Sequence, residues 1–300
     1  MQTPLARHES DRPEVEIHLK LENLQPIGSF KLRGALNRML AAPRESLARG
    51  VYTASAGNMA QGVAWAAREL GIGARVIVPD SAPRAKIDAI VRLGADVVPV
   101  PYDDWWAAMR DHGRPGFGGT FVHPFADRDV MAGNGTIAVE ILGALGELDA
   151  IFVPWGGGGL ACGIAAAAKA LRPGVRVYAC EVDGAAPLAA SLDAGRPVGI
   201  DNRRTFVDGI GGRGVFPEMW SIARDLIDGS LVVGIDDVAD ALRVMVQRNR
   251  IVAEGAGAAA LAAARVSGVT RDYRRVACIV SGGNIDAPVL ATILSGSMPE

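Results

Sequence analysis

The sequence predicts an α/β protein of two domains, each with a mostly parallel, twisted sheet flanked by helices. Short apolar segments alternate with longer amphipathic segments along the chain, which is typical of parallel strands joined by crossover helices. Several apolar segments end in glycine-containing turns that lead into the next helical segment. A chain of 300 residues, 49% of them hydrophobic, is also long enough to bury a large core.

The expected strands are short apolar runs, at 15–22, 51–54, 74–79, 95–100, 149–154, 175–181 and 276–280. The expected helices have apolar residues at helical spacing, at 59–70, 83–93, 130–145, 160–171, 238–249 and 256–266. The last of these is nearly all alanine, which predicts a buried helix. We assign residues 50–125 to a small, mobile domain and residues 1–49 and 126–300 to a large domain. The glycine-rich stretch 113–119 is expected to be one exposed loop.

The composition of the chain argues against nucleic acid and membranes as binding partners. The 31 basic and 33 acidic residues give a net charge of -2, which creates no field of one sign for nucleic acid or anionic lipid. The N-terminus lacks the apolar stretch of a signal peptide, and no apolar run reaches the ~18 residues of a membrane helix. The three cysteines lack CxxC spacing, which favours buried thiols over disulfides or a metal site. We therefore expect a cytoplasmic protein that binds neither membrane nor nucleic acid.

The first segment that suggests chemistry is NLQPIGSFKLRGA, where Pro26 and Gly28 enforce a turn and Lys31 opens a helix. The positive end of that helix and the neighbouring Arg33 would both lower the pKa of the Lys31 amine. A lowered pKa suits an amine nucleophile. The alternative is an ordinary surface lysine in a first helical turn.

The second segment, TASAGNMAQGVA, places Ser55, Asn58 and Gln61 around a glycine at the start of a helix. Backbone N–H groups and short polar side chains in such a turn suit a carboxylate. Taken alone, the segment favours an ordinary helix cap made by Ser55 or Asn58.

The third segment, VPWGGGGLACGIAAA, has four consecutive glycines, 156–159, between a strand and a helix. Backbone without Cβ atoms can wrap a phosphate and direct N–H groups at it. The segment lacks the GK[ST] of a nucleotide-binding loop, and Glu181 matches the acidic residue of a dinucleotide site only loosely. The fourth segment, VACIVSGGN, presents Ser281 and Asn284 after a strand, where a neutral hydroxyl could bond a ring nitrogen.

Taken in order, these segments resemble the fold type II (tryptophan synthase β-like) pyridoxal-phosphate enzymes, and specifically their serine/threonine dehydratase and serine racemase branch. The resemblance runs from TPL at 3–5 to Asn284 and includes GSFKLRGA, SAGN with QGVA, GGGGLA, AEGAGA and SGGN. It implies a pyridoxal 5′-phosphate cofactor, a small amino-acid substrate and a homodimer.

The resemblance also implies roles for individual residues. Lys31 would hold the cofactor as an internal aldimine and move the α-proton, and Glu254 would lie near the leaving group. The remaining cofactor-binding residues would be Phe30, Asn58, Gly156, Gly157, Gly158, Gly159, Leu160 and Ser281. The loop that binds the substrate carboxylate would contain Ser55, Ala56, Asn58, Met59 and Gln61.

The implied reaction is β-elimination of a small β-hydroxy amino acid, such as L-threonine or L-serine, to a 2-oxo acid and ammonia. A neutral serine at the pyridine nitrogen makes the ring a weaker electron sink, which disfavours a long-lived carbanion. The alternatives are a racemase or a β-replacement synthase on the same scaffold, a cofactor-binding protein without turnover, and a nucleotide-binding module.

Some positions depart from the family pattern. Met59, His8, Trp155 and Asn134 replace residues usual in the family, and they indicate either a reshaped substrate pocket or neutral drift in the core. Ala56 stands where racemases place a serine. Pro187 stands where an acidic residue would complete a cation site with Glu181 and Ala185, so we expect no metal. The chain ends soon after SGGN, so feedback control by isoleucine is not expected.

Overall fold

The computed structural model describes residues 1–10 and 14–299. They fold as two compact units, one formed by Met1–Gly28 with the chain from Gly135 onward, the other by Ser29–Asn134. The predicted small domain, 50–125, falls inside the second unit, and its boundaries remain a prediction. In the part of the chain that the structure describes, every helix falls short of the length and apolarity needed to cross a bilayer.

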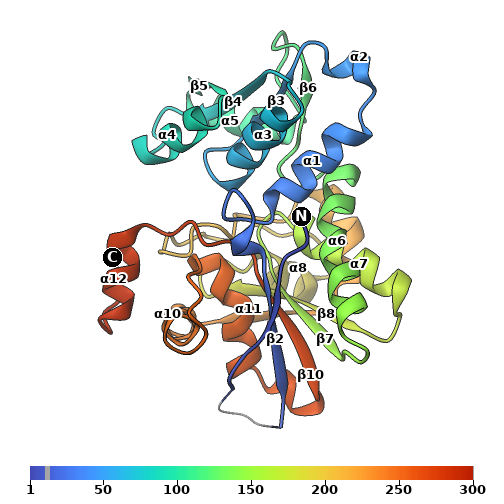
Figure 1. Ribbon diagram of the computed structural model, residues 1–300, viewed down its shortest axis with the longest axis vertical. Helices are drawn as coiled ribbons and strands as arrows, with labels where there is room; N and C mark the ends of the chain where they lie inside the picture. Colours follow the sequence, from blue (N-terminus) through green and yellow to red (C-terminus); the bar gives the residue numbers. More distant parts are fainter. Residues whose placement is uncertain (11–13, 300) are drawn as a thin grey trace. The chain divides into compact units, whose positions relative to one another are not determined.

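The first unit contains a six-stranded sheet in the order β1-β2-β10-β7-β8-β9 (Figure 1). β1 is antiparallel to β2, and the other neighbouring pairs are parallel. The strands are β1 Leu5–Arg7, β2 Glu16–Leu21, β7 Ala150–Pro154, β8 Arg176–Val182, β9 Gly229–Val233 and β10 Arg275–Val280. Because β2, β10 and β7 are neighbours and parallel, the loops that follow them emerge at one edge of the sheet.

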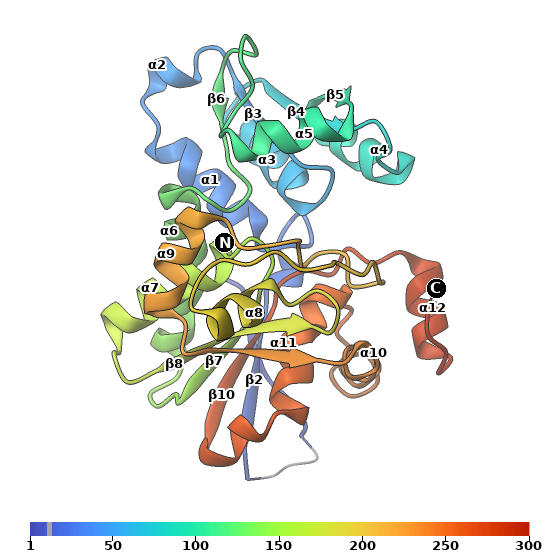
Figure 2. The same cartoon turned by 180° about the vertical axis from the view of Figure 1, so that it is seen from behind.

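The helices of this unit lie on both faces of its sheet, as the opposite views of Figures 1 and 2 show. They are α7 Gly159–Leu171, α8 Pro187–Ala194, α9 Pro217–Leu226, α10 Ile235–Val244, α11 Gly255–Val266 and α12 Ala287–Leu294, with the π-helical turn η2 Met245–Asn249 after α10. Helix α11 packs on β7 to β10 and is buried from Gly255 to Ala264, which confirms the buried alanine helix. Helix α6, Arg128–Ala144, begins in the second unit and ends in the first.

The second unit has a parallel four-stranded sheet in the order β5-β4-β3-β6. Its strands are β3 Val51–Ala54, β4 Ala74–Pro79, β5 Asp96–Val100 and β6 Thr120–Phe121, and its helices are α1 Lys31–Ala41, α2 Arg44–Leu47, α3 Asn58–Glu69, α4 Arg84–Arg92 and α5 Tyr102–Arg110. Helix α1 packs against α3, although the sequence between them contains a strand and a short helix.

The structure confirms the predicted α/β class and all seven predicted strands, with ends that agree within one residue. The sequence did not indicate β1, β6 and β9. β1 and β6 have three and two residues, too few for a recognisable alternation, and β9 begins with Gly-Ser at the sheet edge.

Candidate active site

The glycine loop lies in the first unit, between β7 and α7. Gly158 is the residue before α7 and has a left-handed backbone with φ 90°. A Cβ added there would lie 2.5 Å from Cη2 of Trp155, so the loop requires glycine at this position. A glycine loop at the N-terminus of a helix has the geometry and partial positive charge that fit a phosphate group.

The SGGN turn follows β10 and holds the turn that precedes Lys31 in the chain. The N–H of Gly283 donates to the carbonyl of Gly28 at 2.8 Å, and the Asn284 amide donates to the carbonyl of Ile27 at 2.9 Å. Gly28 has φ +68°, and a Cβ there would lie 2.6 Å from Asn284 Oδ1. Asn284 therefore supports the backbone around Gly28.

Ser281 and Glu254 lie beside this turn. Ser281 is buried directly after β10, the strand between β2 and β7. Glu254 precedes α11, and its backbone N–H donates to the carbonyl of Gly282 at 3.0 Å. Its carboxylate lies against Gly209, where an added Cβ would be 3.3 Å from Glu254 Oε1. The fold thus brings the glycine loop, Ser281 and Glu254 to the same edge of the six-stranded sheet.

Lys31 lies in the second unit, at the first residue of α1. Its Nζ donates a hydrogen bond to the carbonyl of Pro124 at 2.8 Å and stands 5.2 Å from the centroid of the Phe30 ring. Helix α3 passes close by, because a Cβ added to Gly62 would lie 3.1 Å from the carbonyl carbon of Lys31. The lack of a side chain at Gly62 therefore lets α3 approach the backbone of Lys31.

The loop before α3 and the first turn of α3 contain the predicted carboxylate-binding residues. Ser55 Oγ accepts the N–H of Gly57 at 3.2 Å, and Asn58 is the first residue of α3. The residue before α3 is Gly57, which has no side chain with which to cap the helix. Ala56, Asn58 and Gln61 are half-buried.

Met59, the second residue of α3, is more buried than Asn58 and Gln61. Its side chain is 2% exposed and belongs to a hydrophobic cluster that includes Ala35, Met39 and Val63. These contacts account for an apolar residue at position 59 by packing alone. An effect of Met59 on substrate choice remains a prediction.

The sequence analysis missed His123, which follows β6 and precedes Pro124. His123 is 1% exposed, and its Nδ1 accepts the backbone N–H groups of Phe125 at 3.1 Å and Ala126 at 2.8 Å. Burial, with smaller effects from His112 and Lys31, lowers the pKa of His123 from 6.5 to about 3. The available signal was a His-Pro pair at the end of a strand, which predicts an ordered turn.

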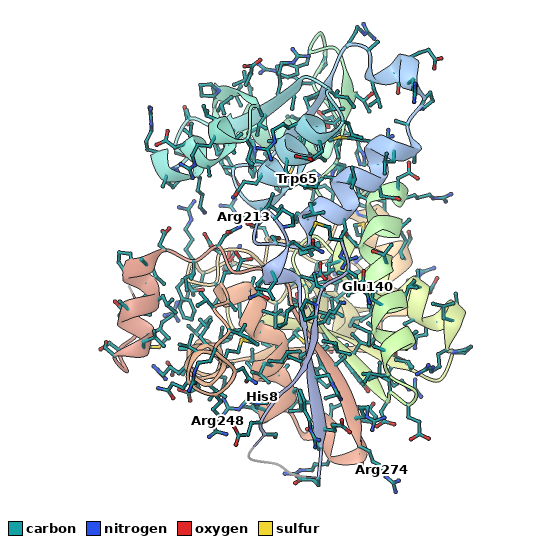
Figure 3. All side chains as sticks on the ribbon, in the orientation of Figure 1. His8, Trp65, Glu140, Arg213, Arg248 and Arg274 are labelled. Carbon is teal, nitrogen blue, oxygen red and sulfur yellow. The ribbon has the colours of Figure 1, made fainter. Side chains whose placement is uncertain are left out.

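The structure corrects the proposed role of His8. The His8 N–H donates to the carbonyl of Ile17 near the start of β2, and its Nδ1 lies 2.7 Å from Asn249 Oδ1. Figure 3 shows His8 toward the end of the sheet where Arg274 lies. This is the amino end of the parallel strands, whereas the glycine loop and Ser281 follow their carboxyl ends. His8 therefore does not line the substrate pocket.

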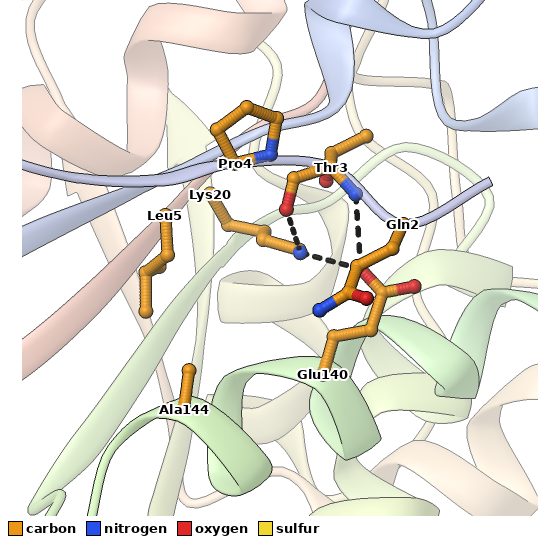
Figure 4. A pocket seen from close by; sticks show the side chains of 7 residues that line it. All are labelled: Gln2, Thr3, Pro4, Leu5, Lys20, Glu140 and Ala144. Atoms are coloured by element: carbon orange, nitrogen blue, oxygen red, sulfur yellow. Dashed lines mark hydrogen bonds and ion pairs between the residues drawn. The ribbon is translucent and has the colours of Figure 1, made fainter.

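A cavity of about 450 Å³ lies among the N-terminal segment, β2 and α6, and Figure 4 shows its lining. The buried amine of Lys20 donates to the carbonyl of Thr3 at 2.7 Å and to the carboxylate of Glu140. The N–H of Thr3 also donates to Glu140, at 3.2 Å. These opposite charges compensate one another and attach the N-terminal segment to α6, which indicates a structural role.

Glu181, considered above as part of a cation site, is fully buried at the end of β8. Its carboxylate accepts the N–H groups of Leu188 at 2.9 Å and Ala189 at 2.8 Å, and the hydroxyl of Ser230 at 2.6 Å. Burial raises the pKa of Glu181 above 4.5, and the hydrogen bonds oppose that rise. The carboxylate therefore binds the first turn of α8, whose dipole favours a negative charge at this end.

Comparison with known proteins agrees with the motifs. The family model described as "Pyridoxal-phosphate dependent enzyme" matches residues 1–282. The chain is 41% identical over 291 residues to an L-threonine ammonia-lyase of Geobacter sulfurreducens, covering 96% of this chain and 72% of that protein.

Two solved structures have the same fold. Threonine deaminase isoform 2 of Solanum lycopersicum has a TM-score of 0.89 at 35% identity, covering 98% of this chain and 88% of that one. A serine racemase from maize has a TM-score of 0.90 at 31% identity, covering 99% and 92%. These findings confirm the fold type II resemblance and the pyridoxal phosphate cofactor, and they leave no support for a nucleotide-binding module. The chain belongs to the family of pyridoxal-phosphate dependent enzymes.

Proposed function

We propose that this enzyme is an ammonia-lyase that dehydrates and deaminates a small β-hydroxy amino acid such as L-threonine or L-serine. One observation carries the proposal: 96% of the chain aligns at 41% identity with an L-threonine ammonia-lyase. The local geometry supports it, because the glycine loop at the N-terminus of α7 suits the cofactor phosphate and the ordered amine of Lys31 suits a Schiff base.

Within this proposal, Gly156 to Leu160 hold the phosphate, Phe30 and Asn58 contact the cofactor ring, and Ser281 hydrogen-bonds its nitrogen. Bound pyridoxal phosphate supplies a sink for the electron pair left at the substrate Cα. The Ser281 hydroxyl is too weak an acid to protonate the pyridine nitrogen, so it would hydrogen-bond a neutral ring.

The protein's own groups would bind the substrate and transfer its proton. The N-terminal turn of α3, with Ser55, Asn58 and Gln61, would bind the substrate carboxylate. The amine of Lys31 would take the Cα proton, and the Pro124 carbonyl, already its hydrogen-bond acceptor, would stabilise the resulting ammonium. The β-hydroxyl would leave as water by taking up a proton from an acid group beside it, and the resemblance places Glu254 near this leaving group. Because elimination needs only one base at Cα, the reaction requires no further titratable group on the opposite face.

A racemase on the same scaffold remains the second candidate, because a serine racemase shares the fold at a TM-score of 0.90. We further propose a cytoplasmic homodimer in which residues 50–125 move as a small domain. The buried state of Cys162, Cys180 and Cys278 supports a reducing compartment. Light scattering on the purified protein tests the dimer.

The decisive experiment is a substrate panel of threonine, serine, 3-hydroxyaspartate and phenylserine, assayed for 2-oxo acid and ammonia in equal amounts. Borohydride reduction of the enzyme followed by peptide mapping should label Lys31. A label on another lysine would refute the assignment of Lys31, and oxo acid formed from none of the four substrates would refute the ammonia-lyase proposal.

A further inference from the structure

The turn from His123 to Ala126 is unusual because one buried imidazole binds two of its backbone N–H groups. Nδ1 of His123 accepts from both Phe125 and Ala126. Nδ1 must therefore carry a lone pair, which places the ring proton on Nε2, and Nε2 lies 3.2 Å from the carbonyl of Met109. Residue 124 is proline and has no N–H, so the imidazole binds the first two N–H groups that follow His123 in the turn.

The ring itself is held firmly. The ring centroids of His112 and His123 are 4.5 Å apart, with an interplanar angle of 32°. The Phe125 ring packs edge-on against the His123 ring, with 4.6 Å between their centroids. His123 is 1% exposed, so the neutral ring has few alternative positions.

The far end of the same turn is also fixed. Asp127 Oδ1 accepts the N–H groups of Asp129 and Val130 at the start of α6, and Asp127 Oδ2 accepts from Arg38 of α1 at 2.9 Å. The carbonyl of Pro124 lies between these two fixed points and accepts the hydrogen bond from Lys31 Nζ at 2.8 Å.

We infer that His123 is a positioning residue for Lys31: its Nδ1 orders the turn that directs the Pro124 carbonyl at the Lys31 amine. The inference rests on the proposed role of Lys31 as the Schiff-base lysine. His123 does not touch the reacting atoms and acts through the Pro124 backbone. A displaced carbonyl would weaken this hydrogen bond and shift the amine from the geometry needed for proton transfer.

The two nitrogens of the ring can be tested separately. In His123→Asn, the amide oxygen takes the place of Nδ1 and can accept the two N–H groups, while the donor to Met109 is lost. In His123→Gln, the amide nitrogen reaches the place of Nε2 and keeps the donor, while the acceptor at Nδ1 is lost. Both variants remove the aromatic contacts, and their side chains differ in size by one methylene group.

We expect His123→Asn to keep kcat within about threefold of the wild type, and His123→Gln to lose kcat by about 10- to 100-fold with KM changed less than threefold. Borohydride trapping at Lys31 in the holoenzyme should be slower in His123→Gln than in His123→Asn. If His123→Gln does not fold, His123→Ala compared with His123→Asn makes the same test, because only Asn restores the acceptor.

Equal losses of kcat in the Asn and Gln variants would overturn the inference and show that the ring only supports packing. So would a greater loss in His123→Asn. The wild-type label separates this result from failure of the proposed function: a wild-type label on Lys31 upholds its role whatever the variants do, and a label elsewhere rejects that role and this inference together.

Discussion

The indole ring of Trp155 lies directly beneath Gly158, so that a Cβ on Gly158 would stand 2.5 Å from its Cη2 atom. Trp155 is 1% exposed, and its ring occupies the space under the turn that leads into α7. The tryptophan, unusual at this position by the family pattern, therefore supports the phosphate loop by packing. The contact also makes Gly158 sensitive to the smallest possible substitution.

We predict that Gly158→Ala lowers the free energy of unfolding by about 2–4 kcal/mol, because it combines a left-handed φ with overlap on Trp155. Its affinity for pyridoxal phosphate should fall at least about tenfold as the loop is displaced. Urea unfolding and fluorescence titration of the cofactor measure the two effects. Gly174→Ala is the control, since an added Cβ there meets nothing within 4 Å. Wild-type cofactor affinity in folded Gly158→Ala would contradict the phosphate role of the loop.

Met59 provides a test of packing against specificity. Met59→Leu should change the free energy of unfolding by less than about 1.5 kcal/mol, because the two side chains are similar in volume. Met59→His should lower it by about 1–3 kcal/mol, because a polar ring would enter an apolar cluster. If Met59 also sets substrate choice, Met59→His will raise kcat/KM for threonine or serine relative to the best substrate. An unchanged ratio assigns Met59 to packing only.

The lowered pKa of His123 predicts a dependence of stability on pH. The unfolded chain binds a proton at His123 below pH 6.5, whereas the folded protein does so only near pH 3. The contribution of His123 to the free energy of unfolding is therefore complete above pH 6.5, and it decreases as the pH is lowered toward 3. Between pH 7 and 5 the loss amounts to about 2 kcal/mol. The charged and titratable groups facing the ring are His112 and Lys31.

Urea unfolding of the wild type and His123→Asn at pH 7 and pH 5 measures this contribution. The stability difference between the two pH values should be about 2 kcal/mol smaller in His123→Asn, because asparagine does not titrate. Equal pH dependence in both proteins would show that the imidazole titrates normally in the folded state.

We expect elimination to prevail over racemisation, because Ala56 stands where racemases of this family place a serine and provides no hydroxyl to act as a second proton donor. A carbanion formed by Lys31 can then be reprotonated only from the same side or lose its β-hydroxyl. Chiral chromatography at partial conversion should show the D-enantiomer forming far more slowly than oxo acid. Ala56→Ser should increase racemisation relative to ammonia release. If the wild type inverts substrate faster than it releases ammonia, the racemase becomes the better assignment.

Glu181 should stabilise the fold and should not bind a cation, because its carboxylate already accepts hydrogen bonds from two N–H groups of α8 and from the Ser230 hydroxyl. Dialysis against EDTA is expected to leave activity and melting temperature unchanged. Glu181→Ala should lower the free energy of unfolding by about 2–4 kcal/mol, because it leaves buried donors without an acceptor. Activity that disappears with EDTA and returns with Mg²⁺ would instead require a cation site.

The sequence by itself determined the fold class, seven of the described strands and the four segments to which the site was assigned. These features depend on local patterns: apolar runs set the strands, and glycine permits the turn at Gly158, so neighbouring residues in the chain contain the information. The motifs also identified Lys31 and the family, because each places particular residue types at fixed positions after a strand.

Only the tertiary structure decided which residues from distant segments meet. The carbonyl that accepts the Lys31 amine comes from Pro124, 93 positions away in the chain, and its orientation depends on hydrogen bonds of His123 that leave no periodic signal. Likewise the family pattern made His8 a candidate for the substrate pocket, yet antiparallel pairing of β1 with β2 places it at the amino end of the parallel strands. Strand direction and burial set these contacts, and both follow from packing of the whole unit.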